Sequence, residues 1–214
     1  MSSSCCEHDC RAPNNTDSGY RGILWLALGV NLSMFLVEIV ASFLAGSVSL
    51  RADALDFLAD ALNYAIALAV IGLSLRWRAG TALVKAGIMA LFGLWVAGSI
   101  VNNAMIRSVP EPEIMGAVGL LALTANIFVA TLLYRHRAND SQAMSVWLCT
   151  RNDCIANVGV MLAGVAVRIS GTPWPDIAVA AVVAYLGLSS AVRIARRAIV
   201  EMRGSHAFIG APAE

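Results

Sequence analysis

The amino-acid sequence predicts an all-α integral membrane protein with six transmembrane helices in one bundle. Of its 214 residues, 58% are hydrophobic and 14% are charged, whereas about 25% are charged in a typical soluble domain. The apolar segments are each around 20 residues long, enough for a helix to cross the hydrocarbon core of a bilayer. A net charge of +1, with no basic face rich in aromatic residues, argues against a nucleic-acid partner.

Six apolar stretches define the expected helices, and residue types that favour helix ends separate them. We expect spans at residues 20–45, 51–75, 81–105, 114–134, 143–169 and 174–197. The expected connections contain Gly46 and Ser47, the charged segment 76–78, Pro110 and Pro112, the polar segment 135–140, and the Gly/Pro-rich segment 171–175. All of these connections are short, so residues 21–197 are expected to form one transmembrane domain.

Basic residues predict how this domain lies in the membrane. Six spans place both ends of the chain on one side, and Lys and Arg are enriched in cytoplasmic loops. Eleven of the fifteen basic residues fall on the side of the termini: Arg11, Arg21, Arg76, Arg78, Lys85, Arg135, Arg137, Arg193, Arg196, Arg197 and Arg203. We therefore expect a multi-pass protein of the cell (inner or plasma) membrane. Residues 1–20 and 198–214 are then short cytoplasmic tails, and the first shows no signal-peptide pattern.

The N-terminal tail carries a group of soft metal ligands, Cys5, Cys6, His8 and Cys10. Cytosolic thiols stay reduced, and reduced thiols beside His suit soft metal ions. Capture or delivery of a metal is one interpretation. The alternative is a tail whose cysteines are incidental or regulatory, because their spacing matches no closed zinc module.

Three aspartates enter the second apolar segment. At about 100° per residue, Asp53, Asp56 and Asp60 share one helical stripe. Each ionised residue near the centre of a membrane helix costs roughly 3 kcal/mol on insertion scales, so such residues indicate an ion pathway or site. The alternative is a set of buried structural carboxylates paired with Arg51 and Arg151.

The fifth segment carries a matching stripe, because Cys149, Asp153 and Asn157 recur every four residues. If the two helices face each other, Asp56, Asp60, Cys149 and Asp153 form a four-ligand set suited to tetrahedral coordination of a divalent transition metal. A thiolate shifts the preference of such a set toward Zn²⁺ or Cd²⁺. An inert, packed thiol is the alternative for Cys149.

Neighbouring polar residues receive lesser roles. Asp53 lies nearer the end of its span and is expected to line the pathway or pair with Arg51. Asn157 continues the stripe of the fifth span as a supporting hydrogen-bond donor. Arg151 lies about 200° from Cys149 around the helix and points away from the site.

The segment from Gly46 to Asn63, together with the Cys-x-x-x-Asp of the fifth span, resembles the cation diffusion facilitator family. The resemblance covers residues from about 21 to 197, including Asn31 and Glu38 in the first span and the Trp-Pro-Asp of residues 174–176. It implies a proton-coupled metal exporter, a homodimer, and a transport site at Asp56, Asp60, Cys149 and Asp153. Zinc-transporting members often have His where this chain has Asp56 and usually have His where it has Cys149. Most members also continue into a cytoplasmic metal-binding domain, so we expect a short form that lacks it.

The expected function is export of Zn²⁺, with Cd²⁺ or Co²⁺ as further cargo, by alternating access and proton antiport. The metal is cargo, so we expect neither a cofactor nor an enzyme. Mn²⁺, Fe²⁺ or Ni²⁺ export on the same fold is the first alternative, and a non-transporting membrane metal sensor is another. An intramembrane hydrolase is disfavoured because Asp56 and Asp60 share one helix.

Overall fold

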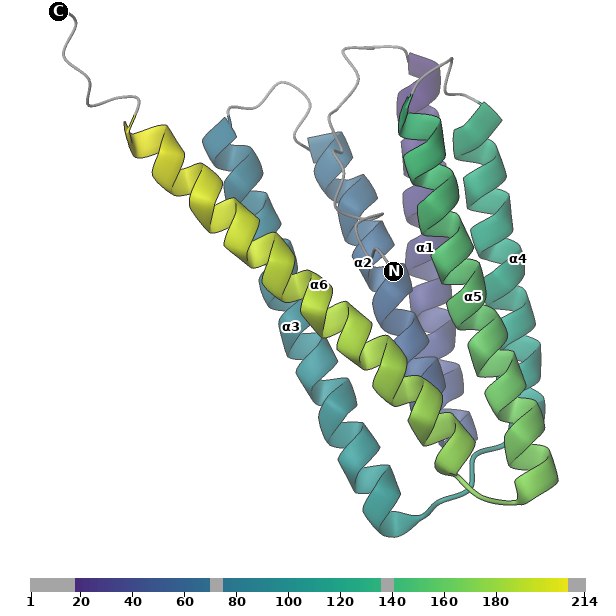
Figure 1. The fold of residues 1–214 in the computed structure, drawn as a ribbon. Helices are drawn as coiled ribbons and strands as arrows, with labels where there is room; N and C mark the ends of the chain where they lie inside the picture. Colours follow the sequence, from purple (N-terminus) through teal and green to yellow (C-terminus); the bar gives the residue numbers. More distant parts are fainter. Residues whose placement is uncertain (1–17, 70–74, 136–140, 208–214) are drawn as a thin grey trace, which may run out of the picture.

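The chain forms a bundle of α-helices in a computed structural model, which describes residues 18–69, 75–135 and 141–207 (Figure 1). The described helices are α1 (Ser18–Ala45), α2 (Val48–Ala69), α3 (Leu75–Ile106), α4 (Pro112–Arg135), α5 (Ser141–Ser170) and α6 (Trp174–Ala207). These ranges contain no strand. The predicted all-α, six-helix fold is therefore confirmed.

The helix boundaries differ from the prediction mainly between the second and third helices. Leu75 begins α3 rather than ending α2, and residues 76–78 are helical. The prediction of a loop at 76–78 is therefore wrong. Arg has a high helix propensity and Trp a moderate one, so these residues end an apolar run without ending a helix. For the same reason α6 continues past the expected boundary at residue 197.

The helices are arranged around α2. It contacts α1, α3, α5 and α6, while α4 packs against α1 and α5, and α3 pairs with α6 along much of its length. We call the end of the bundle that holds Ser18 and Ala207 the terminal end, and the opposite end, with Gly46 and Gly171, the turn end. In Figure 1 the ribbons of α3 and α6 lean away from α2 and α5 toward the terminal end.

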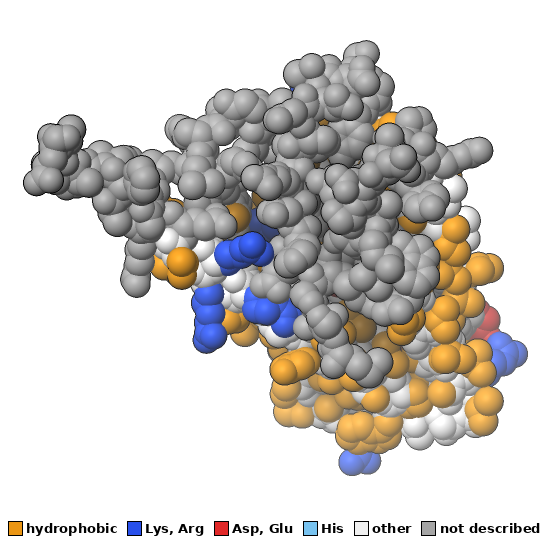
Figure 2. Space-filling model, turned by 45° about the horizontal axis from the view of Figure 1, so that its top comes forward, with side chains coloured by type: hydrophobic (Ala, Val, Ile, Leu, Met, Phe, Trp, Pro, Cys, Tyr) orange, Lys and Arg blue, Asp and Glu red, His pale blue; other side chains and the backbone are white. Residues whose placement is uncertain are grey.

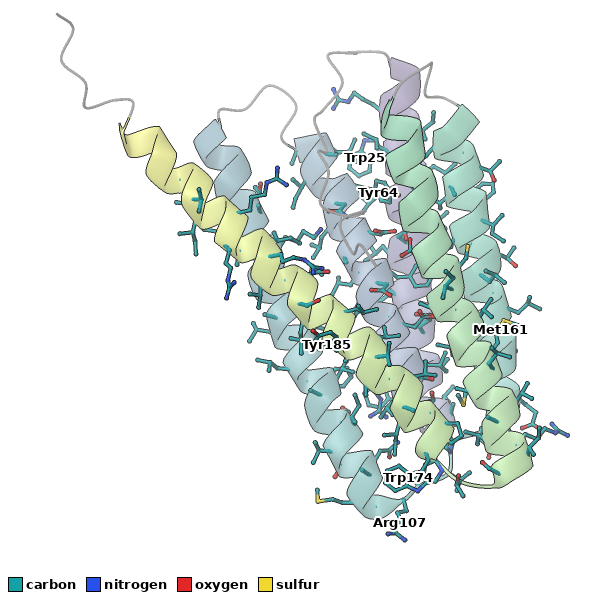
Figure 3. All side chains as sticks on the ribbon, viewed as in Figure 1. Trp25, Tyr64, Arg107, Met161, Trp174 and Tyr185 are labelled. Carbon is teal, nitrogen blue, oxygen red and sulfur yellow. The ribbon has the colours of Figure 1, made fainter. Side chains whose placement is uncertain are left out.

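The outer surface of the bundle is apolar. Five described segments are long and apolar enough to cross a membrane: Arg21–Ala45, Gly80–Ile106, Pro112–Leu133, Asp153–Ser170 and Trp174–Val200. In Figure 2, where undescribed residues cover much of the view in grey, hydrophobic side chains cover much of the lower and right flanks. Trp25 and Trp174 are 59% and 54% exposed and lie toward opposite ends in Figure 3, as expected for aromatic residues at the two membrane interfaces. The chain is therefore a multi-pass membrane protein.

The central helix α2 is not among these apolar segments, because Arg51 and three aspartates interrupt its sequence. Nine of its 22 residues are nevertheless buried, including Val48, Leu50, Leu55 and Phe57. A charged helix is tolerated at membrane depth when it faces the interior of a bundle rather than lipid. The other helices therefore shield α2 from lipid.

Close packing joins α2 to α6 near the middle of the bundle. A Cβ placed on Gly187 would lie 2.5 Å from Leu55 Cδ2, and one on Gly93 of α3 would lie 2.8 Å from Leu188 Cδ2. Leu55 is fully buried. Small residues permit such close approach between membrane helices, so these two glycines set the spacing among α2, α3 and α6.

Candidate metal centre

The α2 carboxylates lie at the centre of the bundle. Asp60 is twelve residues after Val48, which places it about 18 Å along the helix axis. Asp56 and Asp60 are half-buried, and the charges of Asp53 and Asp60 both act on Asp56. The structure therefore keeps the three aspartates close to one another, as their spacing predicts.

A fourth acidic group joins them from α1. Glu38 is fully buried and lies beside Asp53, which is 1% exposed. The two carboxyl groups are within hydrogen-bond reach of each other, and outside this pair neither oxygen of Glu38, nor Oδ2 of Asp53, has a hydrogen-bond partner among the described residues. Asp53 therefore faces Glu38 rather than an arginine, and two buried carboxyl groups share an environment that penalises charge.

Lys85 of α3 is the basic residue that approaches the other end of the stripe. It is 6% exposed, donates a hydrogen bond to Oδ1 of Asn63, and its charge acts on Asp60. Asn63, one turn after Asp60, is itself hydrogen-bonded to that carboxylate. The charge count places Lys85 on the side of the termini and assigns it no partner, and in the structure its side chain is buried inside the bundle. A single basic residue in the apolar stretch of α3 was the available signal.

Arg51 interacts with aromatic side chains near the start of α2. Its guanidinium carbon lies 4.7 Å from the ring centre of Phe43 and 5.9 Å from that of Trp95, a cation–π arrangement. The acidic residue whose charge acts on it is Asp176. This geometry does not favour Arg51 as the partner of Asp56 or Asp60.

The fifth helix supplies the other predicted residues. α5 contacts α2, and Asp153 on it is half-buried. Asn157 is fully buried, and neither Oδ1 nor Nδ2 has a hydrogen-bond partner in the described part of the chain. A buried amide without partners is costly, so Asn157 offers an unused donor and acceptor inside the bundle.

The complete ligand set cannot be assembled from the described side chains. Cys149 and Arg151 lie in α5, but their side chains fall outside the described part of the chain, as do Cys5, Cys6, His8 and Cys10. Among the described residues, no group of three or more His, Cys, Asp or Glu side chains is placed to hold a metal ion. The four-residue set therefore stays a prediction.

The start of α2 is fixed by a residue of α6. Asp176 is fully buried and accepts hydrogen bonds from the Ser47 hydroxyl at 2.7 Å and from the backbone N–H groups of Val48 at 2.8 Å and Ser49 at 3.0 Å. It thus satisfies donors that a helix N-terminus leaves open. The sequence pattern marks Asp176 only as part of the motif that begins the sixth span.

A shell of apolar helices around one acidic helix defines a multi-pass membrane protein that holds charged groups in its interior. Residues 24–202 match the family model described as the cation efflux transmembrane domain. The chain belongs to the cation efflux, or cation diffusion facilitator, family.

Three relatives illustrate the similarity. The metal cation efflux system protein CzcD of Cupriavidus metallidurans is 26% identical over 174 residues, which cover 75% of this chain and 54% of CzcD. The zinc transporter ZitB of Escherichia coli is 26% identical over 201 residues, covering 87% of this chain and 63% of ZitB. ZitB of Yersinia pestis is 27% identical over 205 residues, covering 87% and 64%. The chain thus spans between half and two thirds of the length of these relatives.

Proposed function

We propose that this protein exports divalent transition-metal cations, with Zn²⁺ as the first candidate and Cd²⁺ and Co²⁺ as further ones. The observation that carries the proposal is the acidic stripe of α2 inside an apolar bundle, in a chain of the cation efflux family. Charged groups at this depth indicate an ion pathway. The names of the relatives, a zinc transporter and a metal cation efflux protein, support the class of cargo.

The proposed ion site consists of Asp56, Asp60, Cys149 and Asp153. Two carboxylates come from α2, and α5, which contacts α2, carries the other two ligands four residues apart. Three oxygens and one thiolate suit a borderline ion in tetrahedral geometry. Asp53 lies nearby on the same stripe and Asn157 one turn beyond Asp153, where they would line the pathway.

The carboxylate-rich set also fits harder ions. Three of the four proposed ligands are oxygen donors, which suit Mn²⁺. Export of Mn²⁺, Fe²⁺ or Ni²⁺ through the same site is therefore the second candidate, and the thiolate of Cys149 decides between the two.

Proton exchange would supply the driving force. Aspartate and cysteine must lose their protons to bind a metal ion, so binding releases protons and protonation releases the ion. The proposed cycle loads the site from the cytosol, rocks the bundle and discharges outside. In this orientation the terminal end is cytoplasmic and the turn end faces outward, in agreement with the basic residues Arg193, Arg196 and Arg197 near the end of α6.

Two further parts of the proposal concern the whole protein. The Cys5, Cys6, His8 and Cys10 group would deliver metal to the cytosolic entrance, since thiols beside His bind soft ions. A homodimer in the cell membrane is proposed from the family resemblance.

Transport by purified protein in liposomes tests the proposed function. Uptake of Zn²⁺, Cd²⁺, Co²⁺, Ni²⁺, Fe²⁺ and Mn²⁺ is followed with an internal metal indicator, and proton movement with an internal pH indicator, for wild type and Asp60→Asn at equal protein density. We expect zinc-dependent flux with proton counterflow in the wild type and loss of both in the variant. Absence of flux for all six ions would contradict the proposal, and metal flux without proton movement would contradict the antiport.

A further inference from the structure

Lys85 is the only lysine in the chain, against fourteen arginines, and among the described side chains it is the basic one whose charge acts on Asp60. It belongs to a segment apolar enough to cross the membrane, Gly80–Ile106, and it is 6% exposed. A buried ammonium in such a segment is costly unless an anion or hydrogen-bond acceptors compensate for it. The reason for its presence must therefore lie in what it contacts.

The contacts of Lys85 point to α2. Its ammonium donates to Oδ1 of Asn63, and its charge acts on Asp60, which Asn63 also hydrogen-bonds. The three residues thus form one polar group that joins α2 to α3. One turn further along α3, Met89 packs with Leu55 and Ala191 in the apolar core. Lys85 therefore takes a core position on its helix.

The choice of lysine is informative. An arginine guanidinium would hold a carboxylate through a rigid, bidentate fork, whereas a lysine ammonium is a point charge on a flexible stem with three rotatable donors. Asn63 gives this ammonium a neutral acceptor beside Asp60. Lys85 can therefore leave the carboxylate and keep a hydrogen bond.

We propose that Lys85 is a counter-cation of the α2 carboxylates. Its ammonium pairs with the Asp60 carboxylate in the ion-free protein and moves away from it when a divalent cation binds. This inference rests on the proposed ion site. A divalent ion at Asp60 would lie close to this ammonium, which Asn63 keeps nearby, and like charges repel strongly at low dielectric. Lys85 therefore lowers the affinity of the site and makes release of the ion possible, which a transporter requires.

Equilibrium zinc binding to the detergent-purified full chain tests this inference, with a chelating indicator as competitor. Lys85→Met removes the charge and keeps the length of the side chain, whereas Lys85→Arg keeps the charge. Arg107→Met, at an exposed residue of the turn end, is the matched control. We expect Lys85→Met to bind Zn²⁺ at least about tenfold more tightly than wild type. Lys85→Arg should bind Zn²⁺ no more tightly than wild type, because a guanidinium holds a carboxylate more rigidly than an ammonium does, and Arg107→Met should stay within about threefold of wild type.

A merely structural lysine would give the opposite result, because its loss would disturb Asp60 and weaken binding. Unchanged or weaker zinc binding by folded Lys85→Met overturns the inference while leaving the proposed function intact. If the wild-type protein binds none of the six divalent ions, the proposed function fails and the inference fails with it.

Thermal unfolding keeps the inference testable if Lys85→Met is too unstable for binding measurements. Removing the ammonium leaves Asp60 buried without its cation, so the unfolding temperature should fall, and adding Asp60→Asn should restore most of the loss. A double variant as unstable as Lys85→Met alone would show that the two groups do not form a pair, and the inference would be wrong.

Discussion

The carboxylate of Asp176, at the start of α6, caps the start of α2: its Oδ2 accepts a hydrogen bond from the Val48 backbone nitrogen at 2.8 Å. The two residues are 128 positions apart in the sequence, so this contact fixes two distant helices to each other at the turn end. Toward the terminal end the ribbons of α6 and α3 lean away from α2 (Figure 1). The cap therefore joins α6 to the start of α2 at the turn end, from which the two helices diverge.

The cap gives the first prediction. Asp176→Ala removes the acceptor of the Ser47 hydroxyl and of two backbone N–H groups, and buried donors without partners cost on the order of 3 kcal/mol together. We expect a clear fall in unfolding temperature, measured by light scattering or intrinsic fluorescence in detergent. Asp176→Asn keeps one acceptor oxygen and should lose less.

Glu113→Gln is the control for this prediction. Glu113 also lies in the first turn of a helix at the turn end, where it forms a salt bridge with Arg168, but both side chains are more than half exposed. Exposed ion pairs contribute about 0–1 kcal/mol, so this variant should unfold close to wild type. Equal losses in Asp176→Ala and Glu113→Gln would contradict the assigned role of the cap.

The contact between Gly187 and Leu55 gives the second prediction. In Gly187→Ala the new Cβ would lie 2.5 Å from Leu55 Cδ2, and overpacking of this kind typically costs about 1–3 kcal/mol. Gly98→Ala is the matched control, because no atom lies within 4 Å of its added Cβ, and Ala in a helix interior is favoured over Gly by about 1 kcal/mol. Detergent unfolding should therefore move in opposite directions for the two variants, and a stabilised Gly187→Ala would contradict the packing described here.

The third prediction concerns Glu38. Its carboxyl group is fully buried within hydrogen-bond reach of Asp53, and its oxygens have no partner outside this pair among the described residues. Glu38→Gln keeps the shape, removes one acidic group and brings an amide donor toward Asp53, so we expect a higher unfolding temperature, by the equivalent of about 1–2 kcal/mol. The gain should disappear when Asp53→Asn is already present, because the two groups act on each other. A gain of the same size in the Asp53→Asn background would mean that the residues are independent.

The fourth prediction tests the source of ion selectivity. The preference for Zn²⁺ and Cd²⁺ over Mn²⁺ is attributed to the Cys149 thiolate. In liposome transport, Cys149→Ser should reduce zinc and cadmium flux more than manganese flux, and Cys149→His should keep zinc flux while reducing cadmium flux. Cys154→Ser, one position on from Asp153, is the control and should resemble wild type. If Cys149→Ser leaves the order of ions unchanged, another residue sets the preference.

Local patterns predict the helices and the acidic stripe, but not how the helices face each other. Periodicity alone places Asp53, Asp56 and Asp60 on one face, because that relationship lies within a single helix. The position of Lys85 opposite Asp60 depends on the depth and rotation of α3 against α2. The cap by Asp176 likewise depends on how α6 meets the start of α2. Both relationships join residues that are far apart in the sequence, so no local pattern predicts them and only the structure shows them.

The same distinction explains the misassigned charges. The basic residues of segment 76–78 are expected in a loop, because charge usually ends a membrane span, whereas Lys85 falls inside the expected span 81–105 and is assigned only to the side of the termini. Charged residues with a high helix propensity can continue a helix, and segment 76–78 and Lys85 all belong to α3. The depth of a charged residue in the membrane depends on the residue that compensates its charge. For Lys85 the compensating residues lie on α2, so the sequence of α3 alone does not predict its depth.

The proposed transport requires that divalent ions bind between α2 and α5. The number of Zn²⁺ ions bound per chain at equilibrium tests this binding. The protein for this measurement lacks residues 1–15, so that the cysteines of the tail do not contribute. We expect one ion per chain in this protein and in the Glu113→Gln control. Each of Asp56→Asn, Asp60→Asn, Cys149→Ser and Asp153→Asn should weaken binding by at least about tenfold, since the loss of even an outer partner of a metal ligand costs about 10–100-fold. Unchanged zinc binding in folded Asp60→Asn and Asp153→Asn would contradict the claim.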